Sequence, residues 1–413
     1  MSTVSTGRES SFRIPPSPVA LSEDEEQRAR RLHEESTVFF CHDHLIHQAD
    51  IERMADGGAS AKQLHLCLDA RVWCENEVFL ATAQDRGIAR EFALKGLDLE
   101  PAVLTPWQAH LGLQETFTVS ALVAFDYLHW LVDASGGFIT LALEPDDIRR
   151  AKERRGITLL LGSEGARLLS DRVEVLRMLY RLGLRHLQLS WALDNSIGTP
   201  QTDTSGEGLT AFGRQVIAEM NRLGIIVDVS HLSYGSIAEA LEVSETPILN
   251  SHTGALALNS LQPQLLPDQL IRATAAQGGV LGIHFMSQMV KPGNEKARFD
   301  DLMRQFTYIA ELVGPEHLAC GPDYLPTNDS RIWEHQHSRP FSFAEGVEDI
   351  DCMFNVTRGL VKHGFSDEEI RGILGGNLLR LFEAVHSARA QHPPARYDLP
   401  AELGVLTQGT TPL

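Results

Sequence analysis

The chain has little cysteine and no long hydrophobic run. Its 413 residues include only five cysteines: Cys41, Cys67, Cys74, Cys320 and Cys352. Their spacing forms neither a zinc-knuckle pattern nor a disulfide framework, which suits a reducing compartment. No apolar stretch approaches the ~20 residues that a membrane-spanning helix needs. We therefore expect neither a disulfide-stabilised scaffold nor a transmembrane protein.

Positive charge is also in short supply. The chain has 36 Lys and Arg residues against 55 Asp and Glu residues, which gives a formal net charge of −19 at pH 7. Proteins that bind nucleic acid or anionic membranes carry basic surfaces, so we expect neither as a partner. The first residues include no hydrophobic segment of the kind found in secretory signals. The sequence therefore predicts a cytoplasmic location.

Apolar residues are plentiful, at 43% of the chain, and they occur in short strand-like runs that alternate with helical patterns. This length and alternation predict an α/β protein whose main domain, residues 37–386, is a (β/α)8 TIM barrel. Residues 1–36 are expected to form a flexible arm and a charged helix that starts near Ser22. Residues 387–413 are polar and rich in proline, and we expect an irregular tail there.

Two consecutive strand-like runs lead to histidines. The runs 225–229 and 247–249 are followed by His231 and His252, and a segment with helical spacing lies between them. In parallel sheets the functional groups collect at the carboxyl ends of the strands. Two histidines at corresponding positions of neighbouring βα units therefore predict one cavity and a shared metal ion.

The first expected strand, residues 38–44, ends in a His-x-His pattern. Because side chains alternate along a strand, His42 and His44 face the same way and could grip one metal ion. The alternative is two solvated loop histidines. The strand-like run 156–165 carries Glu164 near its end, between small residues that leave room for a ligand.

Eight strands are expected in all, and polar residues follow several of them. The strands end near His44, Ala70, Glu164, Ser190, His231, His252, His284 and Asp323. Imidazoles and carboxylates favour zinc among the divalent metals, and we expect two zinc ions. A carboxylate can bridge two cations whereas a neutral imidazole cannot, so Glu164 is the expected bridge. His42 and His44 would bind one ion, and His231 and His252 the other.

Further polar residues are expected around this centre. Asp323 ends the last strand and would orient a metal-activated water, take its proton and carry it to the leaving group. His284 also ends a strand, and we expect a supporting or packing role for it. The loop 324–343 contains Arg331 and His335, which we expect in the wall of the substrate pocket; the alternative is a solvated loop.

These residues occur in motifs that resemble the membrane (renal-type) dipeptidases, peptidase family M19. The similarity extends from about His42 to Val385. It is carried by LLLGSEG, GLTAFGRQVIAEMNRLGIIVDVSHLS, TPILNSHTGALAL, HLACGPDY and FSDEEIRGILGGNLLRLFEAV. The resemblance implies a barrel of the metal-dependent amidohydrolase-like type, a dinuclear zinc site, hydrolysis of short peptides and a homodimer.

The resemblance also implies roles for single residues. Glu164 matches the bridging glutamate of the family. His231 and His252 match the histidines of the second metal. Asp323 matches the catalytic aspartate.

Three positions depart from the family pattern. His44 stands where the family has an aspartate, which removes one negative charge from the centre. Trp191, a candidate substrate-binding residue, stands where the family has a histidine that helps to bind the tetrahedral intermediate; an indole N–H donates one hydrogen bond but cannot become cationic. No arginine lies near Gln262 or Gln264, where the family's carboxylate-binding arginine is expected.

The sequence therefore leaves three hypotheses. The first is a zinc-dependent hydrolase that cleaves an amide bond in a dipeptide or a small peptide-like molecule. In the second, the same dinuclear site opens a lactone or cyclic amide, or catalyses a non-hydrolytic step such as an isomerisation. The third is a non-catalytic relative that keeps the barrel and a metal. Asp323 argues against the third, because a structural zinc site needs no spare carboxylate.

Overall fold

The structure is a computed structural model, and it describes most of the barrel. The described residues are 12–44, 48–66, 101–191, 195–202, 207–293, 295–324 and 342–389. Arg331 and His335 lie outside them, so their predicted place in the pocket wall stays a prediction. Among the described helices, none combines the length and the apolar character needed to cross a bilayer.

Within the described residues, eight parallel strands from two sheets form a closed ring. They are β1 (Phe39–Phe40), β2 (Ala61–Leu66), β4 (Ile157–Ser163), β5 (His186–Gln188), β6 (Ile226–Asp228), β7 (Leu249–Thr253), β8 (Val280–Ile283) and β9 (Leu318–Cys320). A parallel bridge between Leu161 and Leu184 links β4 to the chain entering β5. The Cys41 N–H donates to the Cys320 carbonyl oxygen over 2.9 Å and joins β1 to β9. The predicted (β/α)8 barrel is confirmed.

The strands differ from the expected ones mainly at their ends. A short additional strand, β3 (Ile139–Leu141), pairs with the first part of β4 and lies outside the ring. β1 covers only two residues of the predicted 38–44, and β7 extends through His252, which was expected just beyond a strand. Hydrophobic patterns show which segments are extended, but they do not show where the hydrogen bonds between neighbouring strands stop.

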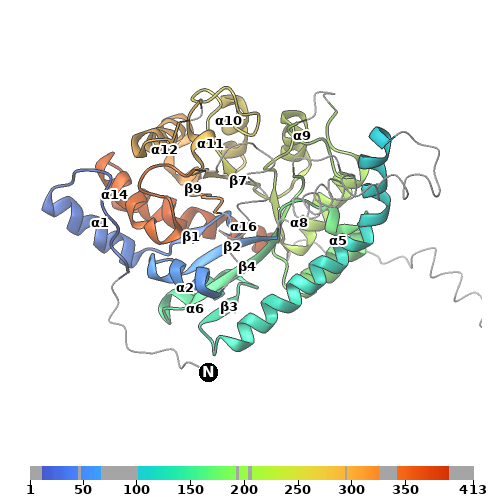
Figure 1. The fold of residues 1–413 in the computed structure, drawn as a ribbon, viewed down its shortest axis with the longest axis horizontal. Helices are drawn as coiled ribbons and strands as arrows, with labels where there is room; N and C mark the ends of the chain where they lie inside the picture. Colours follow the sequence, from blue (N-terminus) through green and yellow to red (C-terminus); the bar gives the residue numbers. More distant parts are fainter. Residues whose placement is uncertain are drawn as a thin grey trace, which may run out of the picture.

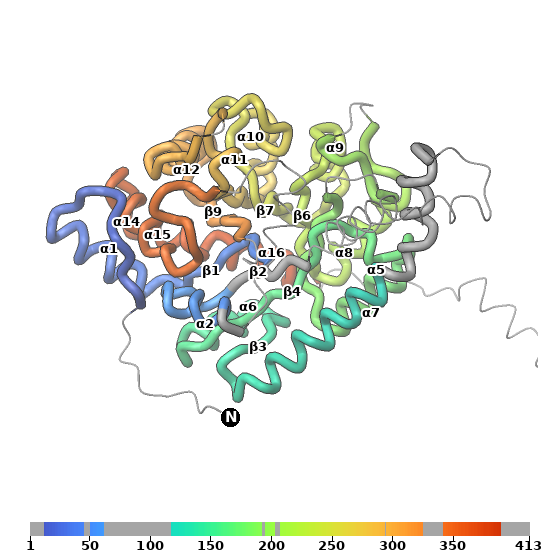
Figure 2. The backbone as a smooth tube through the Cα atoms, viewed as in Figure 1, coloured from blue at the N-terminus to red at the C-terminus, as the bar shows by residue number. Residues whose placement is uncertain are grey.

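Helices surround the ring, as Figure 2 shows for the chain from α6 to α14. They are α1 (Glu23–Glu35), α2 (Gln48–Asp56), α5 (Pro101–Ala134), α6 (Pro145–Glu153), α7 (Val173–Arg181), α8 (Ala211–Leu223), α9 (Tyr234–Val243), α10 (Asp268–Ala276), α11 (Ser287–Val290), α12 (Phe299–Val313), α14 (Phe354–Lys362), α15 (Asp367–Arg371) and α16 (Asn377–Ala388). Thr210 caps α8, because its side chain accepts from the Gly213 N–H over 2.9 Å. Gly224, at φ 75°, ends the same helix in the left-handed conformation that suits glycine.

One end of the barrel interior is filled by apolar side chains. Inward-facing residues of the strands meet the last helix, α16, in a single buried cluster. The strand members include Phe39, Leu160, Ile226, Leu249, Val280 and Ala319, and the helix contributes Leu378, Leu381, Phe382 and Val385. Because this end is closed, polar groups inside the barrel can reach solvent only towards the carboxyl ends of the strands.

In the part of helix α5 whose side chains are described, from Phe117 onwards, only one face is buried. Its buried face carries Phe117, Ala121, Phe125, Leu128 and Leu131. Val119, Leu122, Val123 and Trp130 are exposed, and the helix runs along the outside of the molecule (Figure 1). Because apolar residues also occur on the exposed face, the sequence gives only a weak periodic signal for the face that packs on the barrel.

The amino-terminal helix packs against the barrel helices. α1 begins after Ser22, as expected, and lies beside α14 in Figures 1 and 2. Its buried His33 places Nε2 2.8 Å from the Gly57 carbonyl oxygen and Nδ1 2.8 Å from the Thr357 hydroxyl. A carbonyl oxygen only accepts, so Nε2 carries the proton and donates to Gly57. In the neutral ring Nδ1 then accepts the hydrogen bond from the Thr357 hydroxyl. The domain boundaries at residues 36 and 386 stay a prediction.

We expect His33 to make the fold sensitive to mild acid. Burial lowers the pKa of His33 to about 4, whereas an unfolded histidine has a pKa of about 6.5. Between these values the unfolded chain binds more protons than the native one, so stability falls as the pH falls through this window. The loss below pH 4 amounts to about 3 kcal/mol.

Urea unfolding of the wild type and of His33→Gln at several pH values between 4 and 7 measures this contribution. The glutamine amide can still donate to the Gly57 carbonyl oxygen but does not titrate, so the variant should lose less stability on acidification. His363→Gln, at an exposed position after α14, is the matched control and should keep the wild-type slope. Equal slopes for His33→Gln and the wild type would contradict the assignment.

Candidate metal centre

Six of the predicted site residues come together at the carboxyl end of the barrel strands. They are His42 and His44 after β1, Glu164 after β4, His231 after β6, His252 in β7 and Asp323 after β9. Five of the side chains are more than nine-tenths buried, and that of Asp323 is slightly more exposed, at 12%. The structure thus brings together residues that lie up to 281 positions apart in the sequence.

The first histidine pair faces one side of Glu164. His42 Nε2 and His44 Nε2 lie 3.0 Å apart. The His44 Nε2 atom is 3.4 Å from Glu164 Oε2, and the His42 Nε2 atom is 3.8 Å from Glu164 Oε1. Both rings therefore point the same nitrogen towards one point beside the carboxylate, as the His-x-His pattern predicted.

The second histidine pair faces Glu164 in the same manner. His231 Nε2 and His252 Nε2 lie 2.9 Å apart. They are 3.0 Å and 3.5 Å, respectively, from Glu164 Oε1. Glu164 therefore lies between the two pairs, which is the position that a bridging ligand requires.

These residues fit two divalent metal ions. Zinc–nitrogen bonds of about 2.0–2.1 Å place two nitrogens on one ion roughly 3.0–3.4 Å apart, close to the separations within each pair. The ligand atoms of His42, His44 and Glu164 all lie within 4.8 Å of one another, and so do those of Glu164, His231 and His252. Imidazole nitrogen with carboxylate oxygen is a donor set that suits zinc.

Asp323 lies beside the first pair and is held from behind by His284. Its Oδ1 atom is 3.1 Å from His44 Nε2 and 3.4 Å from His42 Nε2, and its Oδ2 atom is 3.2 Å from His284 Nε2. The Met286 N–H donates to His284 Nδ1 over 3.2 Å. The proton of His284 is therefore on Nε2, the atom that faces Asp323 Oδ2, and this contact gives His284 a supporting place.

The surroundings favour the protonation states that metal ligands need. Burial raises the pKa of Glu164, but the hydrogen bond from His231 and the nearby His44 outweigh it and lower the pKa to about 2. Asp323 is also buried, yet hydrogen bonds led by that from His284 hold its pKa well below the usual value. Burial lowers the pKa of His252 well below its usual value. Ionised carboxylates and a neutral imidazole can bind a metal without first losing protons.

Two of the candidate residues have an unusual backbone. His231 has φ 65° and Asp323 has φ 60°, the left-handed region that residues other than glycine rarely adopt. Such conformations cost free energy and persist where the surrounding structure holds them, often at functional sites. The barrel therefore holds these two side chains in place at an energetic cost.

Gln188 belongs to the centre but was missed by the sequence analysis. It is buried at the end of β5, and its amide nitrogen lies 3.5 Å from Glu164 Oε1 and 2.7 Å from the Ser190 carbonyl oxygen. The available signal was a glutamine between Leu187 and Leu189 in a short expected strand.

Of the residues discussed for substrate binding, the structure describes Trp191 and Gln264. Trp191 follows β5 and is buried, so its substrate-binding role stays a prediction. The Gln264 amide donates to the His252 carbonyl oxygen over 3.3 Å, and this side chain therefore supports β7.

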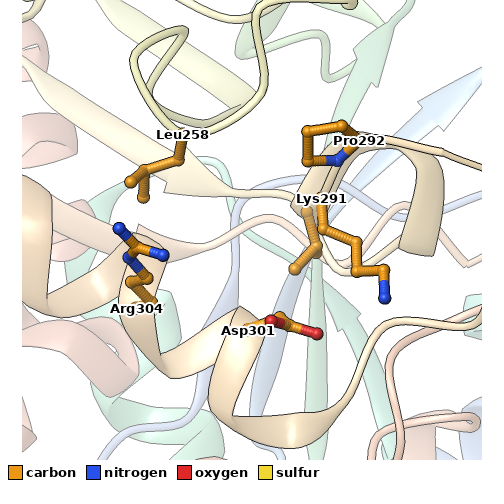
Figure 3. A pocket seen from close by; sticks show the side chains of 6 residues that line it. Leu258, Lys291, Pro292, Asp301 and Arg304 are labelled. Carbon is orange, nitrogen blue, oxygen red and sulfur yellow. The ribbon is translucent and has the colours of Figure 1, made fainter.

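A separate cavity of about 270 Å³ opens between the loop after β7 and helix α12 (Figure 3). It is lined by Leu258, Val290, Lys291, Pro292, Asp301 and Arg304. Asp301 caps α12 by accepting from the Arg298 N–H over 2.9 Å, and Lys291 faces Glu295 over 3.5 Å. None of the lining residues belongs to the metal centre.

Comparison with known proteins gives one family. A family model described as membrane dipeptidase (peptidase family M19) matches residues 31–395. Dipeptidase tcpJ from Claviceps purpurea is 28% identical over 285 residues, which cover 68% of this chain and 62% of that protein. Dipeptidase 3 from Homo sapiens is 29% identical over 296 residues, or 69% of this chain and 56% of that protein. The chain thus spans less than two thirds of the length of these curated relatives.

Solved structures share the fold. An amidohydrolase from Pseudomonas aeruginosa superposes with a TM-score of 0.70 at 21% identity and covers 87% of this chain and 99% of its own. A metallo peptidase from Rhodobacter sphaeroides, liganded with a phosphinate mimic of the dipeptide L-Ala-D-Ala, superposes with a TM-score of 0.65 at 18% identity. It covers 85% of this chain and 99% of its own. At this level of identity the likeness shows the barrel fold alone.

Glu164→Gln should weaken the metal centre without unfolding the barrel. The amide is nearly the same size but carries no charge, so it binds two cations poorly. We expect metal content, measured by elemental analysis after gel filtration, to fall from two ions per chain to one or fewer. Glu239→Gln, on the half-exposed face of α9, is the matched control and should keep both ions. Unchanged metal content in Glu164→Gln would contradict the bridging role.

Proposed function

The chain belongs to the membrane dipeptidase family, peptidase family M19, and from this premise we propose that it is a zinc-dependent hydrolase. Its substrate would be a dipeptide or a small peptide-like molecule, cleaved at an amide bond. The observation that carries the proposal is the convergence of two histidine pairs on the buried carboxylate of Glu164, with Asp323 beside the first pair.

The ligand sets follow from the distances within the cluster. His42, His44 and Glu164 would hold one ion, and Glu164, His231 and His252 the other. When bound, the two ions would polarise the scissile carbonyl and lower the pKa of the attacking water. The protein contributes a buried, water-poor setting in which such electrostatic effects are strong.

Asp323 would move the proton. Its Oδ1 atom faces the first histidine pair, where it can accept the proton of the attacking water, while His284 holds Oδ2. Its pKa lies well below the usual value, so the side chain is ionised before the reaction and can accept this proton, which it would then pass to the leaving nitrogen. This use of Asp323 also argues against a non-catalytic relative.

The carboxyl end of the substrate is where this chain would differ from its family. No arginine lies at 262–264, and Gln264 is engaged with the His252 carbonyl oxygen. We propose a substrate that is blocked or unusual at this end, since a free carboxylate would lack its charged partner. Trp191 in place of a histidine supports a second candidate, the opening of a lactone or cyclic amide, for which weaker oxyanion support would suffice.

We further propose a cytoplasmic location. The cysteines within the described residues, Cys41, Cys320 and Cys352, are all free. Burial raises the pKa of the Cys320 thiol to about 12 and that of the Cys41 thiol well above its usual value, so both stay protonated and unreactive. The homodimer implied by the family resemblance stays a prediction.

The first test pairs metal analysis with a substrate panel. Protein purified without added metal should contain about two zinc ions per chain. It should hydrolyse some members of a panel of dipeptides, including D-residue and C-terminally amidated forms, with a preference for the amidated ones. Two zinc ions without any peptide turnover would favour the lactone or cyclic-amide candidate, and protein that binds no divalent metal would overturn the proposal.

Asp323→Asn tests the proton-transfer step separately. The amide keeps the size of the side chain but cannot accept the proton, so we expect turnover to fall by about 10²–10⁴-fold. Metal content should stay at two ions per chain. Asp300→Asn, at an exposed position of α12, should leave both quantities unchanged. Full activity in Asp323→Asn would exclude this residue as the general base.

A further inference from the structure

One buried hydroxyl group lies behind both halves of the metal centre. Ser251 Oγ is 3.0 Å from His42 Nδ1 and 3.0 Å from His252 Nδ1. The opposite nitrogens of these rings, the Nε2 atoms, face Glu164. His42 belongs to the first ligand set and His252 to the second, so a single serine contacts one ligand of each set.

The chemistry of the rings gives these contacts a direction. A neutral imidazole that binds a metal through Nε2 carries its proton on Nδ1. His42 and His252 then both donate to Ser251 Oγ, whose two lone pairs can accept both hydrogen bonds. The Ser251 O–H remains free to donate, and Ser230 Oγ lies 3.2 Å away.

The hydrogen-bond chain ends on a buried carboxylate. Ser230 Oγ donates to Asp228 Oδ1 over 2.8 Å and has a second acceptor in reach, Asn250 Oδ1 at 2.9 Å. The Ser251 N–H also donates to Asp228 Oδ1, over 3.2 Å. Asp228 Oδ2 lies 2.9 Å from His186 Nε2, and both side chains are fully buried.

We propose that Ser251, Ser230 and Asp228 form a positioning relay for the two metal sites. The relay fixes the proton of His42 and His252 on Nδ1 and orients both rings, so that one hydroxyl couples the two ligand sets. It rests on the proposed function, because it requires both histidines to bind metal through Nε2. Partners of this kind commonly affect metal affinity by 10–100-fold.

The other histidine of the second set shows why the relay matters. His231 Nδ1 is buried and has no hydrogen-bond partner among the described residues. The described contacts of that ring are made through Nε2, which lies 3.0 Å from Glu164 Oε1 and 2.9 Å from His252 Nε2. In the second ligand set, the hydrogen bond between His252 Nδ1 and Ser251 Oγ is therefore the contact that orients a ligand ring from the side away from Glu164.

Ser251→Ala tests the relay through metal affinity. Metal-free full-length protein is titrated with Co²⁺ in competition with a chromophoric chelator, and the visible absorption of bound Co²⁺ is recorded at saturation. We expect the Co²⁺ dissociation constants of both sites to rise by about 10–100-fold, with altered absorption bands. Ser244→Ala also removes a buried hydroxyl, one that donates to the Thr246 carbonyl oxygen over 2.8 Å, and should stay close to the wild type in both readouts.

Asp228→Asn provides a second variant in case Ser251→Ala does not fold. It keeps one acceptor oxygen but loses the charge, so it should weaken both sites less than Ser251→Ala does. Wild-type affinity and spectrum in the folded variants would overturn the relay alone, and weakening of only one site would overturn the coupling through Ser251. A wild-type chain that binds no Co²⁺ would instead overturn the proposed function together with the relay.

Discussion

The placement of the Glu164 carboxylate between two pairs of histidines is the constraint on which the centre depends. A carboxylate buried in a protein interior is costly unless it is paired or binds a metal. Here the hydrogen bond from His231 and the nearby imidazoles outweigh the effect of burial and keep the pKa of Glu164 at about 2. The same four rings direct Nε2 towards it, so the contacts that favour an ionised Glu164 also form the two candidate metal-binding groups.

The alternation of side chains along the strands builds the barrel interior in layers. Ile226 and Leu249 belong to the apolar cluster that packs on α16, and the next inward positions of the same strands, Asp228 and Ser251, are polar. The ligands come after them, towards the open end. The apolar layer excludes water from one end of the barrel. The low dielectric constant there strengthens the hydrogen bonds of the polar layer, which contacts the candidate ligands.

Local patterns predicted the barrel, and they also predicted which residues come together around Glu164, because each of these residues immediately follows or ends a recognisable apolar run. They did not predict contacts that depend on the register between strands. Asp228 meets His186 and Ser251 only because β5, β6 and β7 are neighbours in one register. Gln188 reaches Glu164 because the two residues pair across a parallel bridge between β5 and the chain that follows β4. A largely apolar helix such as α5 also gives only a weak signal for the face that packs on the barrel.

The family resemblance implies an aspartate where this chain has His44, and this difference would change how the first ion is held. With an aspartate there, two carboxylates would attract that ion, whereas here the candidate set has two imidazoles and one carboxylate, which would be shared with the second ion. Less of the binding free energy then comes from opposite charge, and more depends on ring orientation. A lower negative charge also leaves the centre more electrophilic. Ser251, which orients His42, should therefore matter more in this chain than in relatives with an aspartate at this position.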